Sequence, residues 1–437
     1  MLISGAKIVN EGKTFEADLL IHKGRIEKIA PFIAAPPRTR VWNAKGKLLL
    51  PGMIDDQVHF REPGFPDKGD IASESAAAAA GGVTSFMDMP NTNPQTVTRE
   101  ALAAKYAAAE HRAHANYAFY FGATNDNLAA IEKLKRKDAC GVKVFMGAST
   151  GNMLVDDPQT LDRIFARCPL LIATHCEDTP TIKANEAVAR EKYGEDVPVT
   201  EHPRIRSEEA CWKSSELAVS LARKHKARLH VLHLTTAREL ALFEPDHPAI
   251  TAEACAHHLF FNDSHYAGLG NKLKCNPAVK TEADRKGLLQ GVKDGRITVI
   301  ATDHAPHTAA EKAQPYLKAP SGLPLVQHVL LMLLELMSRG ELDLHTIVKR
   351  TSHSVAQRFG IKDRGYIREG CWADLVAVDP KTPTEVSAQN LLYRCGWSPF
   401  EGTSFLHSIA ATWVNGDLAY ENGVLAAKPH GKRLEFI

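Results

Sequence analysis

The 437 residues include 53 basic and 51 acidic side chains, so the charge balance gives no sign of binding to nucleic acid or to a membrane surface. We therefore expect a small-molecule ligand. The chain is long enough for a barrel of about 250 residues and a smaller domain. Its eight cysteines include no CxxC pair, and no apolar run reaches 18 residues. These features predict free thiols in a soluble, cytoplasmic protein.

Both ends of the chain have the alternating pattern of short β-strands. Residues 2–9 and 18–30 alternate or run apolar, with the turn-like Lys23-Gly24 inside the second segment, and strand-like runs return at 373–379 and 410–417. Segments this small do not fold separately, so we pair them in one discontinuous β-sandwich domain. The predicted boundaries are 1–50 and 365–437 for this small domain and 51–364 for the region between.

The central region alternates between helices and strands. The patterns predict helices at 70–80, 99–112 and 127–137, and strands at 83–87, 117–121, 141–146, 170–174, 229–233, 250–253 and 298–301. Strands separated by helices indicate parallel pairing, and about eight of them favour an α/β fold with a closed (β/α)8, TIM-like barrel. An open doubly wound sheet is the alternative, but no GxGxxG follows the first strand.

The stretch 55–64 places polar residues where a core strand should have none. It follows the apolar run 48–54, and an extended strand would put Gln57, His59 and Arg61 on one face. The stretch is either a solvated edge strand or the mouth of a barrel. In a barrel, residues at the carboxyl ends of the strands converge on the ligand.

Polar side chains also end or follow the other predicted strands. Together with the first stretch they form this set: Gln57, His59, Asn91, Lys143, His175, His233, Asn276, Asp303, His304 and His307. A single histidine at such a position is usually structural. Several imidazoles and a carboxylate at the ends of different strands instead predict a catalytic metal site with open positions for water and substrate.

Lys143 is the unusual member of this set because burial of an ammonium group beside metal ions is unfavourable. A neutral amine could capture carbon dioxide and become a carbamate that bridges two metals. The simpler interpretation is a lysine inside the barrel that pairs with Asp303, and the spacing alone favours that pairing.

The motifs resemble those of cyclic-amide amidohydrolases, and specifically those of the dihydroorotase family. The similarity extends over essentially the whole chain, including residues 370–379, and no single motif decides it. The motifs in order are 55–64 (DDQVHFREPG), 89–92 (MPNT), 141–143 (GVK), 174–177 (THCE), 230–233 (HVLH), 275–277 (CNP) and 301–307 (ATDHAPH).

The resemblance implies a role for each matching residue. His59, Asp303 and a carbamate on Lys143 would hold one zinc, and the same carbamate with His175 and His233 would hold a second. A hydroxide between the metals would be the nucleophile, and Asp303 would be the general acid and base. Arg61 and Asn91 would bind the substrate carboxylate, while Asn276, His307 and the loop at 320–322 would hold the ring. The resemblance assigns no role to His230, His257, His258 or His304.

The implied reaction is the reversible cyclisation of N-carbamoyl-L-aspartate to L-dihydroorotate in pyrimidine synthesis. Alternatives are an allantoinase or hydantoinase-like cyclic ureide hydrolase, and an inactive dihydroorotase-like subunit that scaffolds aspartate transcarbamoylase. The resemblance also implies a homodimer, with association with aspartate transcarbamoylase as a further partner.

The chain departs from the family pattern at two positions. Dihydroorotases usually have His-x-His, whereas this chain has Gln57 two residues before His59, so the first metal would have at best a weak amide ligand. Many bacterial relatives use an aspartate where this chain has Lys143. A modified lysine at that position is typical of animal dihydroorotase domains, allantoinases and hydantoinases.

Overall fold

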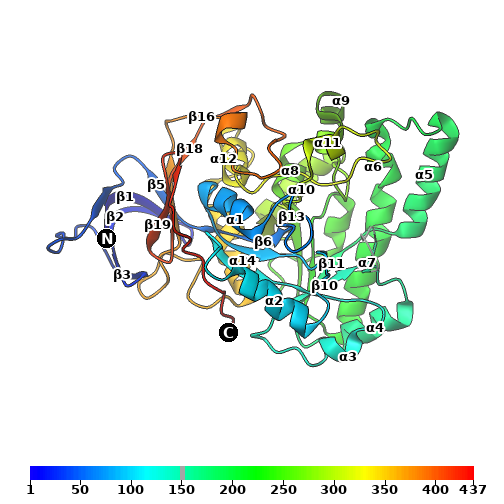
Figure 1. Cartoon of the computed structure of the whole chain (residues 1–437), viewed down its shortest axis with the longest axis horizontal. Coiled ribbons are helices and arrows are strands. Elements are labelled where there is room, and N and C mark those ends of the chain that lie inside the picture. Colours follow the sequence, from blue (N-terminus) through cyan, green and yellow to red (C-terminus); the bar gives the residue numbers. More distant parts are fainter. Residues whose placement is uncertain (148–152) are drawn as a thin grey trace.

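The computed structural model describes residues 1–147 and 153–437, which form a mixed α/β fold. The α-helices mostly alternate with the central strands in sequence, and Figure 1 shows them lying around those strands. They are α1 (Ile71–Ala80), α2 (Arg99–Ala109), α3 (Leu128–Ile131), α4 (Pro158–Arg167), α5 (Thr179–Tyr193), α6 (His202–Ile205), α7 (Glu208–His225), α8 (Ala256–Phe260), α9 (Tyr266–Leu269), α10 (Glu282–Asp294), α11 (Ala309–Lys312), α12 (Val329–Ser338), α13 (Leu344–Val348) and α14 (Ser354–Phe359).

The central strands pair in parallel in two runs. The first run is β6 (Met53–Val58), β7 (Val83–Asp88) and β8 (Asn116–Phe119). The second is β9 (Phe121–Gly122), β10 (Val142–Phe145), β11 (Ile172–His175), β12 (Leu229–Val231), β13 (Ile250–Cys255) and β14 (Val299–Ala301). Only Tyr120 separates β8 from β9, and a parallel bridge between Val58 and His304 connects β6 with the segment after β14.

These strands correspond to the predicted ones, and β6 is buried along its whole length. A solvated edge strand at this position is therefore excluded. Helix α1 begins where the sequence predicted because the Asp70 side chain accepts a hydrogen bond from the backbone of Ser73, and Gly81 caps its end.

The helix predicted at 127–137 is wrong in its extent, because α3 stops at Ile131. Further along, the side chain of Asp138 accepts a hydrogen bond from the Lys135 backbone at 2.8 Å. This local side-chain to backbone bond stabilises a turn in place of another helical turn.

Strands from both ends of the chain form one nine-stranded sheet, at the left of Figure 1. The sequence predicted a small sandwich, and the structure joins its strands in this single sheet. Its strands are β1 (Leu2–Asn10), β2 (Lys13–His22), β3 (Arg25–Ala30), β4 (Val41–Asn43), β5 (Leu48–Pro51), β15 (Leu375–Asp379), β18 (Ser408–Val414), β19 (Asp417–Glu421) and β20 (Val424–Leu425). The short strands β16 (Thr384–Glu385) and β17 (Ser404–Phe405) pair separately.

The antiparallel pairing of β5 with β15 connects the two ends of the chain. Trp42 and Trp413 meet edge to face inside the apolar cluster of this sheet, with ring centroids 4.9 Å apart. Gly52 alone separates β5 from β6, so the sheet continues directly into the first central strand.

All eight cysteines are free thiols, as the sequence predicted. None of the described helices has the length and apolar character that a membrane crossing requires.

Candidate active site

A cavity of about 200 Å³ lies at the carboxyl ends of the central strands. The candidate residues predicted from the sequence, apart from His304, line it together. The lining consists of Gln57, His59, Arg61, Asn91, Lys143, Phe145, His175, His233, Asn276, Asp303, Ala305, His307, Pro320, Ser321 and Gly322.

On the side of the cavity formed by β6 and β14, polar groups bond to one another. The Nε2 atom of His59 lies 3.1 Å from Oδ1 of Asp303, and its Nδ1 lies 2.8 Å from Oδ1 of Asn91. An amide oxygen and a carboxylate oxygen both only accept, so each ring nitrogen of His59 is placed to donate to its partner. The imidazole nitrogen and the carboxylate oxygen thus face the same space.

Gln57 also belongs to this side of the cavity. Its Nε2 donates to Oδ1 of Asp303 at 3.1 Å, while its Oε1 lies 3.9 Å from Sγ of Cys255. Both ends of the amide therefore have protein partners.

The side formed by β10, β11 and β12 carries Lys143, His175 and His233. Nδ1 of His175 lies 3.0 Å from Nε2 of His233, and Nε2 of His175 donates to Glu177 at 2.8 Å. Burial lowers the pKa of both imidazoles, most strongly that of His233. Both rings are therefore neutral at neutral pH and have lone pairs to offer.

Lys143 does not pair with Asp303, so the pairing that the spacing favoured is wrong. Among the described residues, no carboxylate lies within ion-pair distance of its ammonium group, and Asp303 contacts His59 instead. The side chain is only 1% exposed. Burial lowers the pKa of Lys143 to about 8, against the opposing charges of Asp303 and Glu253. About one tenth of the amine is therefore neutral at pH 7, far more than for an ordinary lysine.

Three residues of the cavity have left-handed backbone conformations. The φ angles are 69° for Arg61, 40° for His233 and 50° for Asp303. Such angles are unfavourable for residues other than glycine, and they concentrate at functional sites. The backbone of His233 is held by a hydrogen bond from its N–H to Oε1 of Glu253 at 3.0 Å.

Arg61 and His307 form the wall beyond the histidines. The Nε of Arg61 donates to the Pro306 carbonyl at 3.0 Å, and its terminal nitrogen lies 3.0 Å from Nε2 of His307. Nε2 of His307 also lies 3.0 Å from the Ser321 carbonyl, which fixes the loop at 320–322 against this wall. Burial, followed by the charges of Arg61 and Lys68, lowers the pKa of His307, so its ring is neutral.

Sequence reasoning missed the buried Glu177, which is the outer partner of His175. Arg206 contacts the same Glu177 oxygen at 2.5 Å. Burial raises the pKa of Glu177, but the charge of Arg206 and the contact with His175 lower it by more, so the net shift of this pKa is strongly downward. The two-residue spacing from His175 could have indicated Glu177, whereas no local signal pointed to Arg206.

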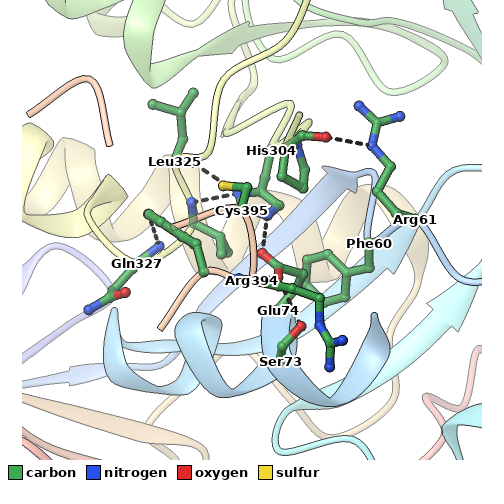
Figure 2. A network of polar contacts seen from close by, with 12 residues as sticks. Phe60, Arg61, Ser73, Glu74, His304, Leu325, Gln327, Arg394 and Cys395 are labelled. Atoms are coloured by element: carbon green, nitrogen blue, oxygen red, sulfur yellow. Dashed lines mark hydrogen bonds and ion pairs between the residues drawn. The ribbon is translucent and has the colours of Figure 1, made fainter. Parts of the chain in front are cut away.

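A second missed residue, Glu74, supports the segment after Asp303, as Figure 2 shows. Its Oε2 accepts from Nε2 of His304 at 2.8 Å, and Nδ1 of His304 accepts from the Leu325 backbone at 2.9 Å. Both nitrogens of His304 therefore have protein partners, and its ring orients the chain beside the cavity.

Two other buried groups have metal-ligating side chains at short mutual distances: Cys255 with His257 and His258, and Asp56 with His230 and Glu253. Nε2 of His230 lies 3.2 Å from Asp56 and 3.7 Å from Glu253. Burial lowers the pKa of His230, but the two carboxylates raise it more. This second group is therefore an internally paired charge cluster inside the strands.

The chemistry of the cavity fits a metal. Neutral imidazoles at a short distance from each other and a carboxylate are ligands that suit a divalent ion, and the buried Lys143 would join them only as a carbamate. The hydrogen bond from His175 to Glu177 also has the form of the outer contacts that orient ligating histidines. The site therefore defines a class of protein, the enzymes with a candidate metal site at the ends of parallel strands.

Comparisons with known proteins agree with that class. The pattern of the amidohydrolase family matches residues 48–419. A dihydroorotase from Halobacterium salinarum is 35% identical over 381 residues, which are 87% of this chain and 88% of the relative. An allantoinase from Bacillus velezensis is 30% identical over 435 residues, which are 97% and 94% of the two chains. The solved L-hydantoinase from Arthrobacter aurescens matches with a TM-score of 0.92 and 25% identity over 99% of both chains.

The chain therefore belongs to the amidohydrolase family. It is an enzyme of the group that hydrolyses cyclic amides, as the named relatives all do.

Proposed function

We propose that the protein is a zinc-dependent dihydroorotase that interconverts N-carbamoyl-L-aspartate and L-dihydroorotate in pyrimidine synthesis. The observation that carries this proposal is the buried Arg61 in the wall of the cavity. Burial lowers the pKa of Arg61 to about 10, so its guanidinium is charged at neutral pH. A guanidinium can pair with a carboxylate through two N–H groups, and dihydroorotate has such a carboxylate.

Asn91 and Asn276 offer further contacts for this substrate. Oδ1 of Asn91 accepts from His59, and its amide N–H groups, which have no partner among the described residues, would donate to the carboxylate. Oδ1 of Asn276 is buried and has no hydrogen-bond partner among the described residues. A ring N–H of the substrate would satisfy it, because a buried acceptor without a partner is unfavourable.

His59, Asp303 and a carbamate on Lys143 would hold one zinc, and the same carbamate with His175 and His233 would hold the other. When bound, zinc would activate water and polarise the amide carbonyl. Burial raises the pKa of Asp303, but its hydrogen bond with His59 and that residue's charge lower it more, so Asp303 is ionised. Asp303 can thus accept a proton from the attacking water and return it to the leaving ring nitrogen.

The proposal includes a closed (β/α)8 barrel as the scaffold. The bridge between Val58 and His304 would close the ring of parallel strands, with β8 and β9 as one interrupted strand. Residues 51–364 would then form the barrel domain, and 1–50 with 365–437 the small domain.

An allantoinase or another cyclic ureide hydrolase is the second candidate, because an allantoinase and an L-hydantoinase are among the similar proteins. The test is to measure kcat/KM of the zinc-loaded protein for dihydroorotate, allantoin and hydantoin. The proposal expects the highest value for dihydroorotate. Preference for allantoin or hydantoin would mean that the protein is a cyclic ureide hydrolase. If none of the three compounds is hydrolysed, the inactive scaffold would be favoured.

A further inference from the structure

Two buried lysines next to the cavity have backbone carbonyls as partners where carboxylates would be usual. Lys312 ends α11 and is 4% exposed, and Lys274 lies two residues before Asn276 and is 8% exposed. Among the described residues, neither lysine has a carboxylate within ion-pair distance. A buried charge without a counter-ion is unfavourable unless its hydrogen bonds are satisfied, so these two positions need an explanation.

Lys312 uses all three of its N–H donors on carbonyls. Its Nζ donates to the carbonyls of Lys274 at 3.0 Å, Pro320 at 2.9 Å and Gly322 at 3.0 Å. An ammonium group has three N–H donors, so none is left over. One side chain thus connects two segments that both border the cavity, the one that leads to Asn276 and the one at 320–322.

Lys274 holds the preceding part of the same loop. Its Nζ donates to the carbonyls of Tyr316 and Ala319, both at 2.6 Å. His202 adds a cross-link, because its ring nitrogens lie 2.8 Å from the Tyr316 hydroxyl and 2.7 Å from the Cys275 carbonyl. Residues 313–322 have no regular helix or strand and only a few backbone bonds, such as that from the Gly322 N–H to the Lys274 carbonyl at 2.9 Å. The side chains of Lys274, Lys312 and His202 therefore add order that a helix or strand would otherwise give.

The loop held in this way contacts the substrate-facing groups. The Ser321 carbonyl lies 3.0 Å from Nε2 of His307, and the same nitrogen lies 3.0 Å from Arg61. Gly322 has a φ of 144°, and a Cβ placed there would lie 2.4 Å from the Ala305 carbonyl oxygen. The loop therefore approaches the cavity wall as closely as a backbone can, and a small displacement would move His307.

We propose that Lys312 and Lys274 are positioning residues that fix the 313–322 loop so that its end, residues 320–322, forms the substrate-binding wall of the cavity. They act through the loop carbonyls and through His307, and do not touch the substrate themselves. This inference rests on the proposed function only for the identity of the substrate. The wall it describes would border any cyclic amide that the cavity binds.

The test compares Lys312→Met with Lys318→Met. Lys318 is an exposed lysine of the same loop, so its substitution is a matched control. For Lys312→Met we expect KM to rise by about 10- to 100-fold with a much smaller change in kcat, since the wall is displaced while the metal side is kept. Lys318→Met should leave both constants unchanged. The assay uses whichever cyclic amide the wild type hydrolyses best, so a change of substrate does not affect it.

A readout that needs no substrate is tryptic cleavage after Lys318. The wild-type loop should resist trypsin, Lys312→Met should be cut, and adding Lys318→Met to that variant should abolish the cut. Lys274→Met, which removes two of the five bonds, gives the same comparison if Lys312→Met does not fold. An unchanged KM with a protected loop would overturn the inference. So would a parallel loss of kcat and zinc content, because that pattern indicates general disruption of the site.

Discussion

The two sides of the cavity differ in how far their polar groups have hydrogen-bond or ion-pair partners within the protein. On the side of β6 and β14, the Asp303 carboxylate has Gln57 and His59 as partners at 3.1 Å each. On the side of β10 to β12, Lys143 has no carboxylate partner among the described residues, and the buried Nδ1 of His233 has no hydrogen-bond partner among them. Polar groups of the first side therefore bond to one another, whereas some on the second side have no such partner among the described residues.

This difference predicts unequal metal binding. A metal on the first side must replace hydrogen bonds that each stabilise the protein by about 1 kcal/mol. A metal on the second side replaces a single such bond, the one between the rings of His175 and His233 at 3.0 Å, and meets neutral imidazoles that Glu177 already orients. We therefore expect the second side to retain its metal more tightly, and the four variants below test that comparison.

The largest effect is expected for Asp303→Asn, which removes the proton acceptor of the first side. We expect kcat to fall by about 10²- to 10⁴-fold, the usual contribution of a general acid or base. The metal held by His175 and His233 should remain. The measurements are steady-state kinetics and zinc per chain, with the surface change Asp294→Asn as control. Activity within threefold of wild type would exclude Asp303 from proton transfer.

Arg61→Ala tests a group that belongs to neither metal side. Loss of a charged partner should weaken transition-state binding of dihydroorotate by roughly 2–5 kcal/mol. Zinc content should stay at the wild-type level, because a guanidinium has no lone pair for a metal. The measurement is kcat/KM together with zinc analysis. Equal turnover of dihydroorotate by both proteins would remove the carboxylate clamp and favour a ureide substrate.

Glu177→Gln should weaken metal binding on the second side through a residue that contacts His175 and does not line the cavity. The neutral amide still accepts from His175 but no longer stabilises charge on that ring, so zinc affinity should fall by about 10- to 100-fold. Titration with zinc in a metal buffer measures this change. Glu186→Gln, which breaks an exposed pair with Arg190, serves as control and should change nothing. Wild-type affinity in Glu177→Gln would mean that the second side does not depend on its outer contact.

The smallest effect is expected for Gln57→His, which restores the usual family residue on the first side. Wild-type protein should lose zinc in two steps as chelator is added, and the variant should lose it in one step with a few-fold tighter first-side site. Because Gln57 bonds to Asp303 and lies next to Cys255, an unchanged release curve would mean that this residue only orders the cavity wall. A single step in wild type at two zinc ions per chain would contradict the difference between the sides.

The cavity lining was predictable because strand ends are visible in the sequence. Apolar runs that end in His59, His175, His233 or Asp303 place these residues at one edge of a parallel sheet. Their partners were not visible, since Arg206 is distant in sequence and reaches Glu177 only through the fold. The left-handed backbone at Arg61, His233 and Asp303 was not predictable either, because these residue types do not favour that conformation.

The nine-stranded sheet was predicted only in part. The alternating patterns at both ends located its strands, and the pairing of the ends followed from their small size. The continuity of the sheet through β5 and β15 depends on backbone hydrogen bonds. Residue types alone do not specify such bonds. The shortened α3 was not predicted either, because the bond that the Asp138 side chain accepts from the Lys135 backbone stabilises a turn that helix propensity does not specify.

The pairing of β5 with β15 also prevents β5 from pairing with strands of other molecules in solution. Without β15, the backbone of β5 (Leu48–Pro51) would present a bare apolar edge, one residue away from β6. An unpaired edge of that kind is a template for a strand of another molecule. The carboxyl-terminal strands thus keep β5, the strand that leads into β6, out of intermolecular sheets. Shortening the chain ahead of residue 375 would therefore be expected to cause self-association before any subtler loss of activity.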